Sequence, residues 1–123
     1  MRHYDEIARF EREGFEIVVD KTWEDLHLRD FFDESVTDLK QLCEDIDSYK
    51  YEWFMLRVRA LFNGHELGCS YLRGCLYEDA KDVLTDGTVE DQLITVLGEA
   101  RAEAQRLAGL LTALLDDKGM VPV

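Results

Sequence analysis

The chain has 123 residues, of which 46% are hydrophobic and 33% charged, and its formal net charge is −13. This composition is typical of a folded globular protein, and the length fits a single domain over residues 1–123 that needs no disulfide or structural metal. The negative charge disfavours direct binding to nucleic acid or to an anionic membrane, and it favours a basic protein partner.

Three elements are expected in the N-terminal part of the chain. Apolar residues on one helical face predict a short helix over 3–12, which Gly14 would end. Alternation of β-branched and polar residues predicts a strand over 15–20. A clean amphipathic pattern predicts a second helix over 36–47, for which Ser35 is the expected N-cap.

The clearest local signal is Asn63-Gly64, the pair preferred in two-residue β-hairpin turns because both residues adopt positive φ. It predicts a hairpin over about 51–71, in which a regular register points Cys69 into the core. Gly68 and Gly74 indicate a bulge or the close approach of another element. The residues expected on the core face of the first strand are Phe54, Leu56, Val58, Ala60 and Phe62.

The outer face of the same hairpin carries a mixed aromatic and cationic stripe. Its members are Trp53, Met55, Arg57 and Arg59. Trp, Met and Arg are enriched in the cores of protein interfaces, so the stripe is a candidate interaction surface. The alternative, which we favour, is that a helix of this chain covers the face and that carboxylates of the chain pair with both arginines.

The last element is a long helix expected over 89–116, with Thr88 as its cap. Its apolar residues alternate in spacings of four and three, which is the heptad pattern of helix-on-helix packing. At ~1.5 Å per residue it would be about 40 Å long, which exceeds the roughly 35 Å diameter of a globule of this size. The candidate self-association residues are Leu107, Leu110, Leu111 and Leu114. Either the N-terminal helix or a second copy, in a homodimer, would cover them.

Together these elements predict an α+β fold. A small antiparallel sheet would be built on the 51–71 hairpin and the 15–20 strand, and helices that include the long C-terminal one would pack on it.

Carboxylates are concentrated between Asp20 and Asp47, where ten acidic residues face only three basic ones. The candidate binding surface comprises Glu24, Asp25, Asp30, Asp33, Glu34, Asp38, Glu44 and Asp45. A fixed array of carboxylates can imitate the phosphates of nucleic acid and occupy a basic groove. The more ordinary alternative is a solvated surface that keeps the protein soluble.

Catalytic and metal-binding motifs are not recognisable in the sequence. His65, Cys69 and Cys75 lack the C-x2-C or H-x3-H spacing of zinc sites. Nucleophile, P-loop and dinucleotide motifs are also missing. We therefore expect a non-enzymatic protein without metal or cofactor, and a small carboxylate-dependent hydrolase is a weaker alternative. The chain has three cysteines without a C-x2-C pair, which suggests reduced thiols. No apolar run approaches the ~20 residues of a membrane span. Both features predict a cytoplasmic location.

Residues 56–80, LRVRALFNGHELGCSYLRGCLYEDA, resemble a segment of small uncharacterised acidic proteins of phages and mobile elements. The segment has no catalytic motif, so no functional residue is carried over. The resemblance implies a small accessory or inhibitor protein carried by such an element. The function we expect is a non-enzymatic acidic binding protein, such as an anti-defence or anti-CRISPR inhibitor, that engages a basic nucleic-acid-binding partner. The alternative is a structural or regulatory homodimer whose acidity serves only solubility.

Overall fold

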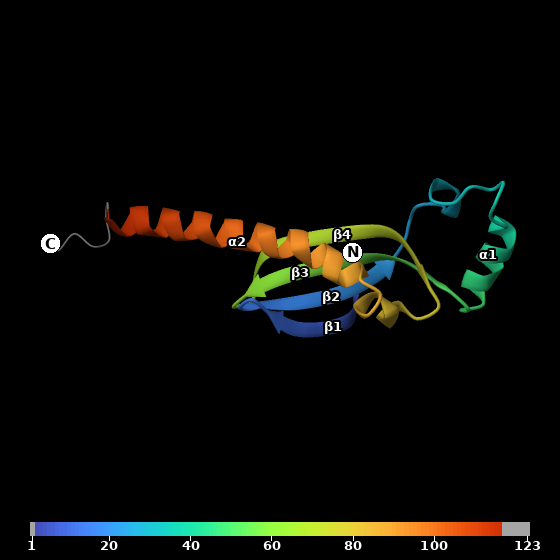
Figure 1. Cartoon of the computed structure of the whole chain (residues 1–123), viewed down its shortest axis with the longest axis horizontal. Helices are drawn as coiled ribbons and strands as arrows, with labels where there is room; N and C mark the ends of the chain where they lie inside the picture. The colour runs from blue at the N-terminus through green and yellow to red at the C-terminus, as the bar shows by residue number, and fades with distance from the viewer. Residues whose placement is uncertain (1, 117–123) are drawn as a thin grey trace.

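The computed structural model describes residues 2–116, which form a four-stranded antiparallel sheet with a long helix across one face (Figure 1). The strands are β1 (Asp5–Arg12), β2 (Phe15–Trp23), β3 (Glu52–Phe62) and β4 (His65–Tyr77), in that order across the sheet. The helices are the 3-10 turns η1 (Leu28–Asp30) and η2 (Ala80–Leu84) and the α-helices α1 (Leu39–Asp47) and α2 (Thr88–Leu114). The predicted α+β class is therefore confirmed.

The first element is a strand, so the helix predicted over 3–12 is wrong. β1 pairs with β2 through a two-residue turn in which Glu13 and Gly14 both have positive φ, at 52° and 87°. Gly14 therefore closes a hairpin and does not end a helix. The register shifts between Glu6 and Ala8. This bulge breaks the period-two pattern and leaves apolar residues at a spacing that imitates one turn of a helix.

The hairpin of β3 and β4 forms around Asn63-Gly64 as predicted, with φ of 48° and 80° at the two turn residues. A bulge at Leu67 then shifts the register by one residue, so Ala60 faces Gly68 and Arg59 faces Cys69. Cys69 consequently lies on the outer face of the sheet, and its predicted core position is wrong.

The bulge at Leu67 has a packing reason. It places Gly68 directly beneath α2, where a Cβ atom would lie 2.4 Å from the carbonyl oxygen of Val96. Only a residue without a side chain lets the helix backbone approach the strand this closely.

The core lies between the sheet and the first half of α2. Its most buried members are Ile17, Val19, Leu56, Val58, Val83, Val89, Leu93 and Val96. Phe54, Leu56, Val58 and Ala60 are buried as predicted, whereas Phe62, at the hairpin tip, is exposed. Among residues 2–116, no helix is long and apolar enough to cross a membrane.

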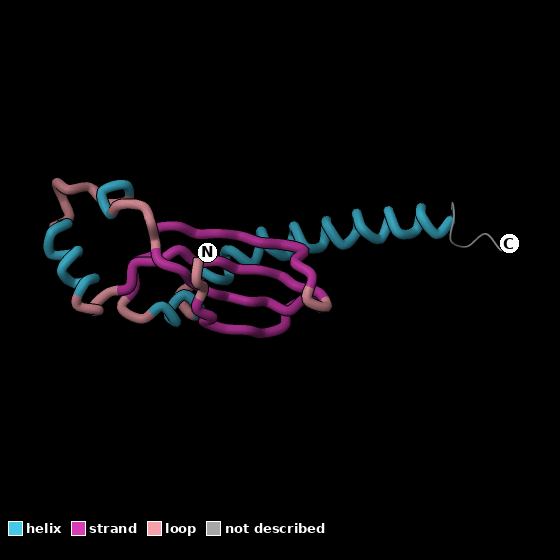
Figure 2. The backbone as a smooth tube through the Cα atoms, turned by 180° about the vertical axis from the view of Figure 1, so that it is seen from behind, coloured by secondary structure: helices cyan, strands magenta, loops and turns pink. Residues whose placement is uncertain are grey.

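The connection between β2 and β3 leaves the sheet as a separate excursion that contains η1 and α1 (Figure 2). α1 begins at Leu39, later than predicted, because Asp38 accepts a hydrogen bond from the backbone N–H of Gln41 and forms the N-cap. Asp33 instead caps a local turn at Ser35, whose N–H and hydroxyl both donate to its carboxylate. None of the α1 residues is buried, whereas Leu28 of η1 is buried and Phe31 packs against Trp53 of β3.

Candidate protein-interaction surfaces

The acidic excursion, which we define as residues 24–50, contains nine carboxylates and three Lys or Arg residues. It lies at one end of the molecule, and the free end of α2 lies at the other (Figure 1). Seven of its carboxylates are exposed: Asp25, Asp30, Asp33, Glu34, Asp38, Glu44 and Asp47. Asp45 is half-buried and accepts a hydrogen bond from the side chain of Gln41. The acidity therefore gathers at one end of the protein.

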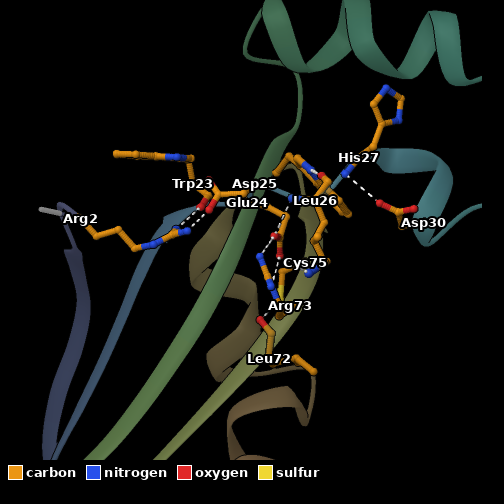
Figure 3. Close-up of polar contacts among 12 residues, drawn as sticks. Arg2, Trp23, Glu24, Asp25, Leu26, His27, Asp30, Leu72, Arg73 and Cys75 are labelled. Carbon is orange, nitrogen blue, oxygen red and sulfur yellow. Dashed lines mark hydrogen bonds and ion pairs between the residues drawn. The ribbon is translucent and has the colours of Figure 1, made fainter.

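Glu24 does not belong to this exposed surface, although the sequence placed it there. Its side chain is fully buried and accepts hydrogen bonds from Arg73 Nη2 at 2.7 Å and from the backbone N–H groups of Gly74 and Leu26 at 2.9 and 3.0 Å (Figure 3). Burial acts to raise the pKa of Glu24, but these donors outweigh it and hold the pKa below its usual value. Glu24 thus fastens the start of the excursion to β4.

Several exposed carboxylates also shape the excursion. Asp30 accepts a hydrogen bond from the backbone N–H of His27, and Asp25 pairs with Arg2 (Figure 3). With Asp33 and Asp38 acting as turn and helix caps, four of the seven exposed acids have local partners. Among the described residues, Glu34, Glu44 and Asp47 form no side-chain hydrogen bond or ion pair, so their charges face solvent alone.

An open aromatic groove lies at the base of the excursion, and sequence reasoning missed it. Its walls include Trp23, Tyr49, Tyr51 and Trp53. The carboxylates of Asp5 and Glu52 also line it, but they pair with His3 and Lys21 of the same groove. Trp23 is 57% exposed and Tyr49 is 90% exposed. The available signal was the aromatic residues that flank the excursion on both sides, but only the closure of β2 against β3 brings them together. Exposed aromatic rings form a surface suited to basic side chains, with which they make cation–π contacts.

The outer face of the hairpin is largely occupied by internal contacts. Asp20, whose side chain is 5% exposed, accepts two hydrogen bonds from Arg57, at 2.8 and 2.6 Å, and one from Arg59, at 3.3 Å. The guanidinium of Arg57 also lies 3.6 Å from the ring centroid of Tyr4, and the Asp20 carboxylate raises the pKa of Arg57. A carboxylate of the chain therefore pairs with both arginines, as we favoured, but it comes from β2 and not from a covering helix.

The remaining members of the stripe also have partners within the chain. Met55 is buried, and Trp53 donates from Nε1 to the backbone oxygen of Leu26 and packs edge-on against Phe31. All four residues of the stripe are therefore engaged within the chain, and the ring of Trp53 also lines the aromatic groove.

The cysteines lie apart. Cys75 is in the core, where burial raises its pKa to about 11, whereas Cys69 is on the outer face and Cys43 is exposed on α1. Among residues 2–116, no group of three or more His, Cys, Asp or Glu side chains is arranged to hold a metal ion.

The second half of α2 projects beyond the sheet into solvent (Figures 1 and 2). Every residue from 105 to 116 is exposed, and residues 107–115 carry no charge. The predicted self-association residues Leu107, Leu110, Leu111 and Leu114 are between 36% and 58% exposed. The N-terminal segment is a strand of the sheet, so it does not cover them.

Comparison with protein-family models, curated proteins and known structures found no match for this chain.

Proposed function

We propose that the chain is a non-enzymatic binding protein that engages a basic partner through the acidic excursion. The observation that supports this function is the gathering of seven exposed carboxylates at one end of the molecule, next to the aromatic groove. Carboxylates steer a basic partner toward the surface, and exposed Trp and Tyr rings supply the contact area that anchors it. A partner that binds nucleic acid through a basic groove has the required charge, and a phage or mobile-element inhibitor of such a partner is the form of this function that we propose.

The difference between the buried, paired carboxylates and the exposed ones supports this proposal further. Asp20 and Glu24 neutralise arginines inside the fold, but Glu34, Glu44 and Asp47 make no internal contact in the described structure. Their charges contribute little to folding and are available to a partner. The basic side chain of a partner would enter the aromatic groove between Trp23 and Tyr49.

The test compares two triple charge reversals. Glu34→Lys/Glu44→Lys/Asp47→Lys alters the excursion, and Glu11→Lys/Glu66→Lys/Glu78→Lys makes the same change of net charge at exposed positions elsewhere. After capture of the basic partner, its affinity is measured by calorimetry at several salt concentrations. We expect the excursion variant to lose at least tenfold in affinity and most of the salt dependence, and the control variant to lose much less. Equal losses in the two variants would mean that only net charge matters.

A second candidate function is a structural or regulatory homodimer, and the exposed leucines of α2 favour it. Light scattering should give twice the monomer mass, and Leu107→Glu/Leu111→Glu should give the monomer. Ile94→Glu is the matched control, because Ile94 is also exposed on α2 but lies over the sheet. A wild-type protein that is monomeric at micromolar concentration would exclude this function.

A further inference from the structure

The leucines at the free end of α2 continue the stripe that packs on the sheet. Leu93, Val96, Leu97 and Ala100 are buried in the core, and the same heptad spacing places Ala104, Leu107, Leu111 and Leu114 on the same side of the helix, past the edge of the sheet. The stripe therefore has a free half that faces the space next to the hairpin tip.

A groove marks the place where the helix leaves the sheet. The hairpin tip contributes Phe62, His65 and Leu67, and α2 contributes Ala104, Leu107 and Leu111. The tip residue Phe62 is 54% exposed. The groove and the free stripe thus form one continuous apolar surface on one side of α2.

The free half of α2 leaves much of its apolar surface open to solvent. Within the described chain, the hairpin tip shares a groove with this segment at Leu107 and Leu111, yet Leu110, Leu111 and Leu114 stay between 52% and 58% exposed. A contiguous apolar patch of this kind is typical of an interaction site. The segment also balances its charges. Residues 101–116 carry Arg101 and Arg106 against Glu103 and Asp116, so this end is neutral in a protein of net charge −13. A second copy can approach here without the repulsion that operates elsewhere on the surface.

We propose that two copies of the chain pair through the free ends of α2 in an antiparallel arrangement, so that the tip of each helix lies in the hairpin-tip groove of the other. This arrangement is a specific form of the homodimer proposed above and rests on it. The contact is isologous, with the same surface used by both copies.

The position of the sheet decides the direction of the pair. Each sheet lies on the stripe side of its own helix. In a parallel pair the two stripes would face each other, and both sheets would have to occupy the space between the two helices. In an antiparallel pair each sheet lies beyond the tip of the partner helix, and only the free halves overlap. The two-fold axis of the dimer then passes beside the centre of the segment 105–116. This places Leu107 opposite Leu114 of the other copy.

Cysteine crosslinking tests the direction directly. Leu107→Cys and Leu114→Cys are made separately in a Cys43→Ser background, which removes the exposed native thiol. Each is oxidised alone and as an equimolar mixture after exchange, with the background protein as the control. Seven residues correspond to ~10 Å along a helix, which is more than the roughly 7 Å between Cα atoms that a disulfide can span.

We expect a covalent dimer in the mixture and little in either variant alone. Crosslinking of the single variants as strong as that of the mixture would establish a parallel pair and overturn the inference while leaving the homodimer intact. A dimeric mass without crosslinking in any sample would place the interface elsewhere and also overturn it. A monomeric mass for the wild type and for the background protein would refute both the arrangement and the homodimer.

Discussion

The Asp20 carboxylate is the most informative single position in the fold, because one buried group serves two arginines on a neighbouring strand. Asp20→Asn keeps the shape of the side chain but removes the charge and one strong acceptor. The three hydrogen bonds it receives from Arg57 and Arg59 span 2.6 to 3.3 Å. The variant therefore leaves two guanidinium groups without their counter-charge on the outer face of the sheet.

The magnitude of the effect follows from burial. Breaking a fully buried ion pair costs about 3–5 kcal/mol. The side chains of Arg57 and Arg59 are 16% and 23% exposed, so water recovers part of their solvation. We expect Asp20→Asn to lower the free energy of unfolding by about 2–3 kcal/mol, which is intermediate between exposed and buried pairs. With a urea m-value of about 1–3 kcal/mol/M, the midpoint should fall by roughly 0.7–3 M at unchanged m.

The assay is urea unfolding at neutral pH, followed by tryptophan fluorescence and circular dichroism. Glu11→Gln, at an exposed position on β1, is the control and should change stability by less than about 0.5 kcal/mol. A double-mutant cycle with Arg57→Met should show coupling, because each single change removes the same contact. If Asp20→Asn proved as stable as the Glu11→Gln control, the arginines would not depend on Asp20 and the reasoning would be refuted.

Two further outcomes are expected. Gly68→Ala should destabilise the protein by about 1–3 kcal/mol in thermal unfolding, because the added Cβ would meet the backbone of α2. Gly98→Ala is the control: its Cβ would meet no atom within 4 Å, so it should stabilise the helix by up to about 1 kcal/mol. A neutral Gly68→Ala would contradict the close approach of α2 to β4. The pKa of Glu24 is lowered in the fold, so its contribution is complete above the ordinary value of 4.5 and is lost as the pH falls through the folded pKa. The difference in unfolding free energy between wild type and Glu24→Gln should therefore shrink steadily below about pH 4.5, and a constant difference across that range would show that Glu24 is not held by Arg73.

The parts of the fold that sequence could predict are those with local causes. Asn63-Gly64 needs only the φ preferences of two residues, and the heptad stripe of α2 needs only its own spacing. The strand β2 was visible because Phe15, Ile17 and Val19 alternate with no irregularity. These signals were sufficient for the α+β class and for a helix longer than its sheet.

The errors arose where a distant element sets the local geometry. Cys69 turned outward because a bulge accommodates the approach of α2 at Gly68, and α2 lies about 30 residues further along the chain. Similarly, the bulge in β1 gives the apolar residues of a strand the spacing expected of a helical turn. A period of two or of 3.6 is informative only while the register is regular, and both bulges interrupt it.

The concentration of carboxylates was visible in the sequence, but its division into buried and exposed residues was not. Asp20 pairs with Arg57 at a separation of 37 residues, and Glu24 pairs with Arg73 at a separation of 49 residues. Neither pair therefore has a sequence signature. Counting carboxylates therefore overstated the exposed surface at its N-terminal boundary. The aromatic groove was missed for the same reason, because Trp23 and Tyr49 meet only after β2 pairs with β3.

Electrostatic repulsion between the acidic excursions of two copies also bears on the direction of the dimer. In a parallel dimer both acidic excursions would lie at the same end, whereas in an antiparallel dimer they are separated by more than the ~40 Å length of α2. That separation is several times the Debye length of about 8 Å at physiological ionic strength, so the excursions do not repel one another. Charge and sterics thus favour the same arrangement for independent reasons. A dimer built this way presents two acidic ends that face in opposite directions, and each can engage its own basic partner without competition from the other.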